Sequence, residues 1–309
     1  MMEAQSTMPD TGRRSPARKL AESKVRSSKK PSRTARDEPR AKHFVNGLAK
    51  GLSMIQAFSS ETPAVTLADA AVATNLTRAS ARRILMTLED LGFVARQGER
   101  HFILTPKVLS LGYAYLASMP LWAFADPVLE ELVEDLGETC SIAVQDDTEL
   151  VYVLRIPVHR ILSQGVTIGS RLPLYCHSAG RTLLAGLNAT QLESYFARAK
   201  FKSYTSKTIV DPTKLKRVIN DVGQQGYAWV SSEMEENISG LSVPIRQSDG
   251  RVIAALNVSL NQPGVKEDDA IRRLLPKLTM AADRLNVSLS VGARAPQRQA
   301  GKLAVSRAV

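Results

Sequence analysis

The stretch covering residues 75–92 constrains the chain most, because it combines a narrow apolar stripe with a basic first half. Apolar residues recur in it at intervals of three, four and seven, which predicts an amphipathic helix; they are Ala81, Ile84, Leu85, Leu88 and Leu91. Thr77 is a suitable N-cap and Gly92 a suitable C-terminal stop. The face opposite the stripe carries Arg83 and small residues. Such a face suits a DNA major groove, but an ordinary solvated helix fits this stretch alone equally well.

The segments on either side decide between these two interpretations. Before this stretch, five apolar residues fall on one face of a helix, which predicts a first helix. These residues are Val45, Leu48, Leu52, Ile55 and Phe58. Residues 66–69 resemble a capping box that opens a short Ala-rich second helix. Residues 93–96 and 101–104 predict two strands joined by a polar loop that contains glycine. Three helices followed by a basic hairpin indicate a winged helix-turn-helix rather than a purely structural module.

The DNA-contacting residues are predicted from their positions on the third helix and the hairpin. They are Arg78, Ser80, Arg82, Arg83, Thr87, Arg96 and Arg100. Arg83 projects furthest from the apolar stripe, so it is the first choice for contacting a base, whereas Arg82 is favoured for a phosphate. Arg96 and Arg100 lie at or beside the hairpin tip and are expected to contact the flanking backbone.

The net charge of +11 lies at the two ends of the chain. Residues 1–42 hold twelve Lys or Arg against five Asp or Glu, and residues 293–309 hold four against none, which leaves the body neutral. We expect a disordered basic arm over 1–43 and a disordered basic tail over 293–309. Basic tails attract phosphates without reading bases. A non-specific binder driven by the arm is therefore one alternative, and it predicts that deleting residues 1–42 removes binding.

Several classes of protein are disfavoured by missing patterns. Cys140 and Cys176 form no CxxC pair and have no metal-ligand spacing with the four histidines, so reduced thiols and no metal are expected. The sequence has neither an 18-residue apolar run nor a secretory leader, which favours a cytoplasmic protein. Enzyme motifs are absent, and no cofactor is expected. A Cys176-His177 thiol site is disfavoured because neighbours in extended chain point apart. An acidic cluster at 233–236 is better explained as a solvated loop than as a metal site with His177.

The rest of the chain predicts a linker and a second domain. Residues 105–120 form an apolar helix that starts at Thr105-Pro106 and must be buried, and a linker that also dimerises explains it. The second domain covers 121–292, after a winged helix-turn-helix domain over 44–104. Its strand patterns cluster at the two ends, including one over 161–168, with helical patterns between them. This arrangement predicts an α+β domain with an antiparallel sheet.

Polar side chains interrupt the apolar strands of this second domain. They are Ser141, Arg155, Arg171, Asn257 and Ser259. A buried polar group is costly unless it is paired, so these residues either line a pocket or face solvent at a sheet edge. Asn257 and Ser259 share one face of their strand, which could be the floor of a pocket. Arg155 and Arg171 could bind a carboxylate through two parallel hydrogen bonds, or could be ordinary surface arginines.

The chain from Phe44 to about Leu289 resembles the IclR-type transcriptional regulators. The resemblance lies in residues 76–88 with 92–94, in 175–185 and in 252–259; residues 44–52 and 104–116 resemble the branch that regulates β-ketoadipate pathway genes. It implies a GAF-like effector-binding domain, dimers that can pair into tetramers, and no catalysis. Members of that branch respond to protocatechuate, 4-hydroxybenzoate or β-ketoadipate.

The family's small acids bind at signature positions that can be carried over to this chain. They are Tyr175, Cys176, His177, Ser178, Gly240, Asn257 and Ser259. Gly240 stands where many relatives have Cys or Ser, and His177 stands where a smaller residue is common, so the ligand is left open between an aromatic acid and a dicarboxylate. We expect a homodimer or a dimer of dimers on double-stranded operator DNA, regulated by a small carboxylate effector. The alternative is a small-molecule enzyme with an accessory DNA-binding module.

Overall fold

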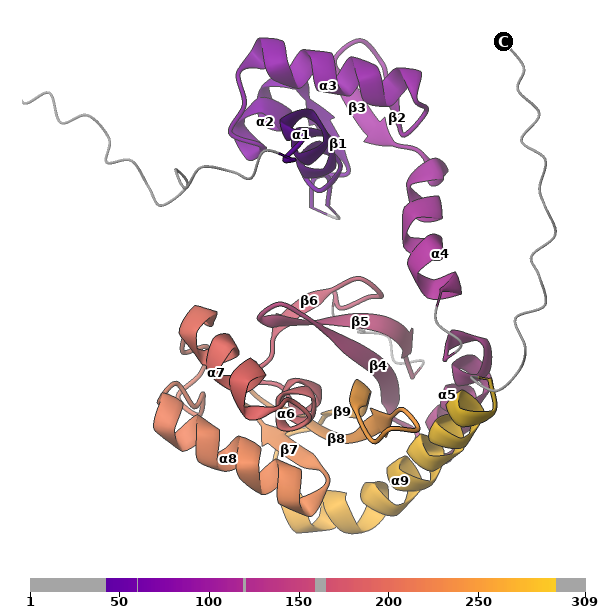
Figure 1. Ribbon diagram of the computed structural model, residues 1–309, viewed down its shortest axis with the longest axis vertical. Coiled ribbons are helices and arrows are strands. Elements are labelled where there is room, and N and C mark those ends of the chain that lie inside the picture. The colour runs from indigo at the N-terminus through magenta and orange to yellow at the C-terminus, as the bar shows by residue number, and fades with distance from the viewer. Residues whose placement is uncertain (1–42, 60, 119–120, 159–164, 293–309) are drawn as a thin grey trace, which may run out of the picture. The chain divides into compact units, whose positions relative to one another are not determined.

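The computed structural model describes residues 43–59, 61–118, 121–158 and 165–292. Within these ranges the chain forms two compact units (Figure 1). The first contains the described residues up to 91 together with 96–103, and the second contains 92–95 and the described residues from 104 onwards. Residues 1–42 of the expected arm and the whole expected tail lie outside the described residues.

The first unit contains three helices and a small sheet. Its elements are α1 (Asn46–Ile55), β1 (Ala64–Thr66), α2 (Leu67–Ala73), α3 (Arg78–Asp90), β2 (Val94–Gln97) and β3 (His101–Leu104), and the strand order is β1-β3-β2. This confirms the predicted winged helix-turn-helix. Strand β1 was not predicted, because three residues are too few to show an alternating pattern. It is held by antiparallel pairing with β3, where Val65 lies opposite Phe102.

Local side-chain bonds set the ends of α2 and α3. The Thr66 Oγ1 atom accepts a hydrogen bond from the Asp69 amide, and the Asp69 carboxylate accepts one from the Thr66 amide, which is the predicted capping box. Thr77 Oγ1 accepts from the Ser80 amide at 3.2 Å, and Gly92 follows α3 with a φ of +76°. Helix α3 buries most of its apolar stripe, but Leu91 is half exposed because it is the C-cap, where the helical period ends.

The predicted first helix is α1, but its apolar face is largely exposed. Val45, Leu48 and Leu52 are 65%, 63% and 48% exposed. Met54, which lies on another side of the helix, is fully buried instead. A period-3.6 pattern shows that a helix has an apolar face but not what covers it, so the direction of α1 could not be read from the sequence.

The second unit is built around a six-stranded sheet in the order β6-β5-β4-β9-β8-β7, with every described pairing antiparallel. After a 3-10 turn, η1 (Pro106–Val108), its elements are α4 (Leu109–Ala117), α5 (Trp122–Leu136), β4 (Thr139–Asp146), β5 (Glu149–Ile156), β6 (Arg171–Pro173), α6 (Ser178–Ala185), α7 (Ala189–Arg198), α8 (Pro212–Gln225), β7 (Ala228–Ser231), β8 (Ile238–Arg246), β9 (Val252–Asn261) and α9 (Glu267–Gly292). The predicted α+β class with an antiparallel sheet is confirmed.

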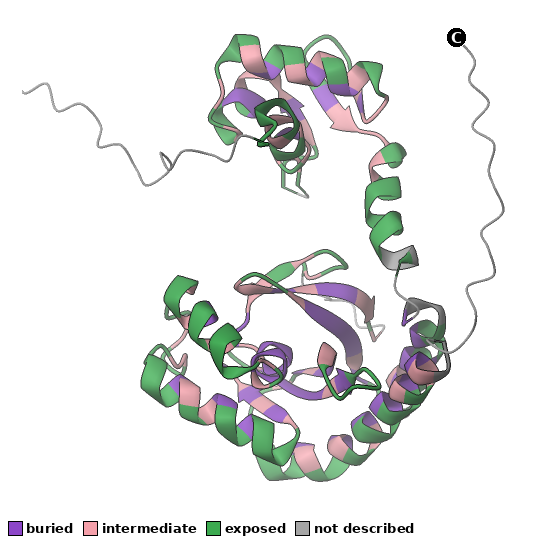
Figure 2. Ribbon diagram, in the orientation of Figure 1, coloured by how far each residue is buried: buried purple, intermediate pink, exposed green. Residues whose placement is uncertain are grey.

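Helices cover both faces of this sheet (Figures 1 and 2). One face packs against α5 and α9 through alternate strand residues such as Ile142, Leu256 and Val258. The other face packs against α6, with α7 and α8 behind it, through Ala143, Tyr152 and Ala255. Helix α6 is therefore buried between the sheet and two helices, as the purple ribbon in Figure 2 shows. Its position places the residues before it against the sheet.

One predicted strand is wrong in position. A strand was expected over 161–168, of which 161–164 lie outside the described residues and 165–168 are not in a strand. The third strand is β6 instead, where Arg171 pairs with Val151. A turn precedes it, in which the Ser170 amide donates to the Thr167 carbonyl at 3.0 Å and Gly169 has a φ of +86°. The chain meets β5 within this turn, where the Gly169 amide donates to the Tyr152 carbonyl at 2.7 Å.

Candidate functional site

A basic hollow lies in the first unit between the start of α2, helix α3 and the β2–β3 hairpin. It has a volume of about 570 Å³ and is lined by Thr66, Leu67, Ala68, Arg78, Arg82, Met86, Arg96, Glu99, Arg100 and Phe102. Four of the seven predicted DNA-contacting residues therefore meet at one place. Arg83 and Thr87 are exposed on α3 outside this hollow, and Ser80 is half-buried.

Arg96 is held in place rather than freely extended from the hairpin. Its Nε donates to Glu89 at 3.1 Å, and its guanidinium lies over the Phe102 ring, 5.0 Å from the centroid. Its Nη2 also lies 3.2 Å from the Met86 sulfur. These contacts join the hairpin to α3, so Arg96 shapes the basic surface as well as adding charge to it.

A chamber of about 180 Å³ lies in the second unit, where β5, β8 and β9 meet the residue before α6. Its lining residues are Glu138, Thr139, Tyr152, Arg155, Val158, Val166, Leu172, His177, Met234, Glu235, Ile238, Ser259, Leu260 and Asn261. Six lining residues are apolar (Val158, Val166, Leu172, Met234, Ile238 and Leu260), and the polar ones come from β4 and the residue before it, β5, β9, the residue before α6 and the loop before β8. This composition is typical of a binding site for a small molecule.

Arg155 supplies positive charge to the chamber. Its guanidinium lies 5.6 Å from the centroid of the Tyr152 ring, which orients it. Among the residues that the structure describes, the ion pairs of this unit do not include Arg155. Arg155 is therefore available to donate hydrogen bonds to an anionic group of a ligand.

His177 and Tyr152 form a hydrogen-bonded pair in the same wall. The Tyr152 hydroxyl lies 2.8 Å from His177 Nε2, and the two rings meet edge to face. Burial lowers the pKa of His177 to about 4, with further lowering by the positive charges of Arg155 and Arg181. Burial also raises the pKa of Tyr152 to about 12. Both side chains are therefore uncharged at neutral pH.

A buried chain of polar groups supports the chamber from behind. Ser178 Oγ donates to Asn257 Oδ1 at 2.6 Å, and Asn257 Nδ2 donates to Ser259 Oγ at 3.0 Å. Asn257 and Ser178 are almost fully buried, and only Ser259 reaches the lining. Gly240 lies beside them, and a Cβ atom there would be 2.4 Å from Ser178 Oγ, so a larger residue would require that hydroxyl to move. The predicted residues Ser178, Gly240, Asn257 and Ser259 thus lie together. Of these four, only Ser259 lines the chamber, and Ser178 and Asn257 support it through hydrogen bonds.

Three other predicted residues do not line the chamber. Arg171 is exposed on β6, with Nε 2.8 Å from Glu149 and Nη1 2.8 Å from Asp146, whereas its neighbour Leu172 lines the chamber, because successive strand residues face opposite sides. Tyr175 is buried, and its hydroxyl donates to the Lys202 carbonyl at 2.6 Å. Ser141 is fully buried on β4 opposite Arg155, and its Oγ has no partner among the described residues.

The acidic stretch at 233–236 departs from the expected solvated loop only at Glu233, since Glu235 and Glu236 are exposed. Glu233 is buried, and its Oε2 accepts from Arg181 Nη2 at 2.7 Å and from the Ile209 amide at 3.0 Å. Its neighbours Met234 and Glu235 line the chamber. The described residues contain no group of His, Cys, Asp or Glu arranged to hold a metal ion. Sequence reasoning missed this pair, because a single Arg on a helix gives no sign of a partner 52 residues away.

The cysteines form no nucleophile couple with His177. Cys140 and Cys176 are buried free thiols, and burial raises the pKa of each to about 12. His177 is bonded to Tyr152, while Cys176 packs among the apolar residues beneath α6. A protonated, buried thiol is a poor nucleophile.

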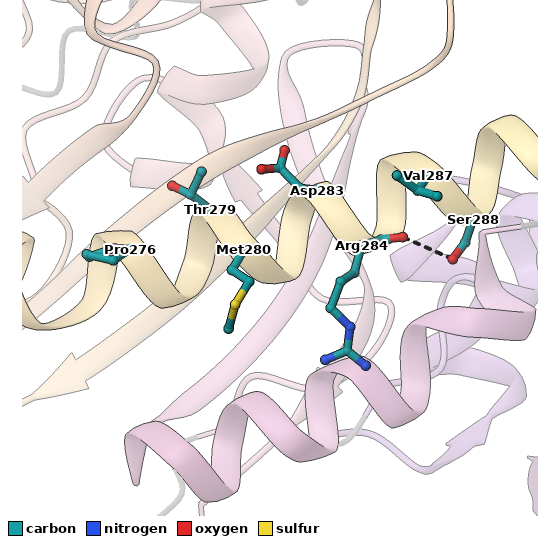
Figure 3. Close-up of a pocket in the computed structure, with 7 residues that line it drawn as sticks. All are labelled: Pro276, Thr279, Met280, Asp283, Arg284, Val287 and Ser288. Atoms are coloured by element: carbon teal, nitrogen blue, oxygen red, sulfur yellow. Dashed lines mark hydrogen bonds between the residues drawn. The ribbon is translucent and has the colours of Figure 1, made fainter.

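A second hollow of the same unit lies along α9 and is shown in Figure 3. It is lined by Pro276, Thr279, Met280, Asp283, Arg284, Val287 and Ser288. All seven residues come from one helix, and Ser288 Oγ donates to the Arg284 carbonyl at 3.0 Å. Arg284 is paired with Glu131 of α5. This open surface does not enclose a ligand, so the chamber is the stronger candidate.

A winged helix-turn-helix joined to a sheet domain with a small-molecule chamber defines a ligand-responsive transcriptional regulator. A family model described as "Bacterial transcriptional regulator IclR C-terminal" matches residues 113–287, and one described as "IclR helix-turn-helix domain" matches residues 47–98. The chain therefore belongs to the IclR family of bacterial transcriptional regulators. Among the described residues, no helix is long and apolar enough to cross a membrane.

Known relatives cover most of the chain. The Pca regulon regulatory protein of Pseudomonas putida is 40% identical over 240 residues, which is 77% of this chain and 82% of that protein. The crystal structure of a Rhodococcus sp. RHA1 protein described as a transcriptional regulator matches with a TM-score of 0.70 at 40% identity and covers 80% of this chain and 98% of that one. The inducer-binding domain of the PobR transcription factor from Acinetobacter, a double mutant in complex with 3-hydroxybenzoic acid, matches with a TM-score of 0.50 at 30% identity over 52% of this chain and 95% of that one.

Proposed function

We propose that this regulator controls genes of aromatic-acid catabolism and that its effector is a small aromatic acid with one carboxylate. The chamber carries this proposal. An apolar cavity of about 150 Å³ holds a benzene ring, so a chamber of about 180 Å³ with both apolar and polar lining residues suits one substituted ring. Arg155 supplies the counter-charge for its carboxylate.

The acidic part of the lining favours one carboxylate over two. Glu235 and Glu138, the latter paired with Arg273 at 3.6 Å, both line the chamber, and a carboxylate close to another carboxylate is repelled. The second carboxylate of a dicarboxylate would have no arginine to pair with, because Arg155 is the only arginine among the described lining residues. The PobR complex with 3-hydroxybenzoic acid supports the same ligand class for this chain.

Replacing Arg155 tests the effector site. We expect isothermal titration to give heats for 4-hydroxybenzoate or protocatechuate and weaker binding for β-ketoadipate. Arg155→Gln should weaken binding of the aromatic acid by about 10-fold to 100-fold, because a hydrogen bond to a charged group contributes roughly 1.5–3 kcal/mol. Arg171→Gln is the matched control, since that arginine is exposed and paired outside the chamber. Equal affinities for Arg155→Gln and the parent chain would contradict the assignment, and β-ketoadipate binding more tightly than every aromatic acid would contradict the ligand class.

We further propose how effector and DNA binding are connected. The chain acts as a homodimer, or as a dimer of dimers, whose two α3 helices dock on the half-sites of a near-palindromic operator through Arg78, Ser80, Arg82, Arg83, Thr87, Arg96 and Arg100. The effector changes the relative placement of the DNA-binding domains through residues 105–118. It can do so only by its different affinity for the two placements.

Catalysis is not part of the proposed function. The relatives are described as regulators, and the thiols are buried and protonated at neutral pH. Incubating the purified protein with the aromatic acids and analysing the mixture by chromatography tests the enzyme alternative. A product that forms with the native chain and not after heat inactivation would favour that alternative.

A further inference from the structure

A carboxylate, Glu89, ends a row of residues on α3 that begins with two arginines. Residues three or four apart share one side of a helix. On α3 such a row consists of Arg78, Arg82, Met86 and Glu89. The first three line the basic hollow. A negative charge beside a surface that binds phosphates repels them, so attraction to DNA does not explain Glu89.

The hairpin residue Arg96 meets the end of this row. Its Nε lies 3.1 Å from Glu89 Oε1 and 3.3 Å from Oε2, so one N–H is shared between the two oxygens. Its Nη2 lies 3.2 Å from Met86 Sδ, one turn earlier on α3. The guanidinium also lies over the ring of Phe102, a buried residue of β3. Helix α3 and both strands of the hairpin are therefore joined through one side chain.

Glu89 supplies the negative charge that keeps Arg96 in this position. Arg78, Arg82 and Arg100 line the same hollow as Arg96, and like charges gathered on one surface repel. Among the described residues of the first unit, the ion pair of this surface is the one between Arg96 and Glu89. An exposed ion pair contributes little to stability, so its loss should affect the placement of the hairpin more than folding.

We propose that Glu89 is a positioning residue of the DNA-binding surface. Through Arg96 it holds the β2–β3 hairpin against α3 in the arrangement that fits the operator, and so it raises the preference for operator over random DNA. The inference rests on the proposed docking of α3 and the hairpin on operator DNA. It assigns a favourable role in DNA recognition to a negatively charged residue.

The ratio of two affinities tests this role. One duplex is selected by the full parent chain from a randomised pool, and the other has the same length and composition in scrambled order. Fluorescence anisotropy at fixed salt gives the affinity for each, and the parent chain should favour the selected duplex by about 10³-fold or more. In Glu89→Ala this ratio should fall by about threefold to fivefold, as the loss of an exposed ion pair allows.

The ratio separates hairpin placement from charge and from folding. A change in protein charge acts through the phosphates, which both duplexes share, so it moves both affinities alike. Partial unfolding also lowers both affinities by the same factor. Alanine favours helices, so the substitution retains α3.

Three further variants serve as controls. Glu89→Gln makes the same change of charge but keeps an oxygen that can accept from Arg96, so it should retain more of the ratio than Glu89→Ala does. Glu99→Ala removes a carboxylate that lines the hollow but does not belong to the pair, so it should raise both affinities and leave the ratio unchanged. In an Arg96→Ala background, Glu89→Ala should lower the ratio no further, because the contact is already absent.

The possible failures are distinguishable. An unchanged or higher ratio in Glu89→Ala overturns the inference and leaves the proposed docking standing. So does a fall of the same size when Glu89→Ala is made in the Arg96→Ala background, since Glu89 then acts without Arg96. A parent chain that binds the selected and scrambled duplexes equally contradicts the proposed docking, and the inference falls with it.

Discussion

Arg181 and Glu233 form the most buried ion pair among the described residues, with side chains 3% and 8% exposed. Arg181 also donates to the Tyr175 carbonyl at 2.9 Å, and Glu233 also accepts from the Ile209 amide. These bonds tie α6 to the loops before α8 and before β8. Because Met234 and Glu235 come next in the chain and line the chamber, the pair positions one chamber wall.

Breaking this pair should destabilise the second unit strongly. Arg181→Met leaves a buried carboxylate without its partner, so we expect a loss of about 3–5 kcal/mol in the free energy of unfolding. Urea denaturation followed by tryptophan fluorescence measures it, since Trp122 and Trp229 are the only tryptophans in the sequence and both belong to the second unit.

Two comparisons control this measurement. The double variant Arg181→Met, Glu233→Leu should recover much of the loss, although the Ile209 amide then loses its acceptor. Arg171→Met removes an exposed ion pair and should change the stability by less than about 1 kcal/mol. If Arg181→Met lowers the free energy of unfolding no more than Arg171→Met does, the buried pair contributes no more to stability than the exposed one.

At the scale of elements, α3 and the hairpin present two kinds of arginine. Arg78, Arg82 and Arg100 line the basic hollow together, whereas Arg83 is exposed outside it on the outer face of α3. Side chains on the outer face of a recognition helix reach base edges, and those on a wing reach the backbone. Truncating an arginine of one group should therefore change DNA binding in a different way from truncating one of the other group.

We expect Arg83→Ala to weaken operator binding by about 1–3 kcal/mol and to relax preference at one base position. Arg100→Ala should weaken binding to all sequences alike and reduce the slope of log affinity against log salt by about one. Fluorescence anisotropy at several salt concentrations measures both. Arg198→Ala on α7 is the control, since that arginine pairs with Asp147 in the other unit. Unchanged operator binding in Arg83→Ala would show that another arginine reads the base.

At the scale of the whole molecule, two helices expose apolar faces that no other described part of the chain covers. On α1 and just before it these residues are Phe44, Val45, Leu48 and Leu52, and on α4 they are Leu109, Leu111, Tyr113 and Tyr115. Grouped exposed apolar residues mark interaction surfaces. A symmetric dimer can cover the same face of both copies at once, so both faces support the proposed homodimer.

Charges on these faces should weaken the dimer. We expect the full chain to sediment as a dimer or larger, and Leu48→Glu combined with Tyr113→Glu to shift it towards monomer at micromolar concentration, because a buried unpaired charge is costly. Val72→Glu places the same charge on an exposed apolar residue of α2, outside both faces, and should leave the assembly unchanged. Sedimentation velocity measures all three. A parent chain that is monomeric throughout would contradict the dimer proposal.

The local chemistry of this protein was determined by the sequence alone. Thr66 and Thr77 cap their helices, Gly92 follows α3, and alternation placed Asn257 and Ser259 on one face of β9, because each of these depends on residues at most four apart. The division into a DNA-binding unit and a sheet unit followed from the same short-range patterns. Arg155 and Arg171 were indistinguishable at this level.

Only the tertiary structure decided which polar residues meet. Pairing of β5 with β4 placed Arg155 at the chamber, and pairing of β5 with β6 placed Arg171 at the surface. The packing of α6 on the sheet brought His177 to Tyr152 and Arg181 to Glu233. These partners are separated by 25 and 52 residues. Their contacts depend on strand register and helix placement, which the burial of the whole apolar core selects and no local pattern encodes.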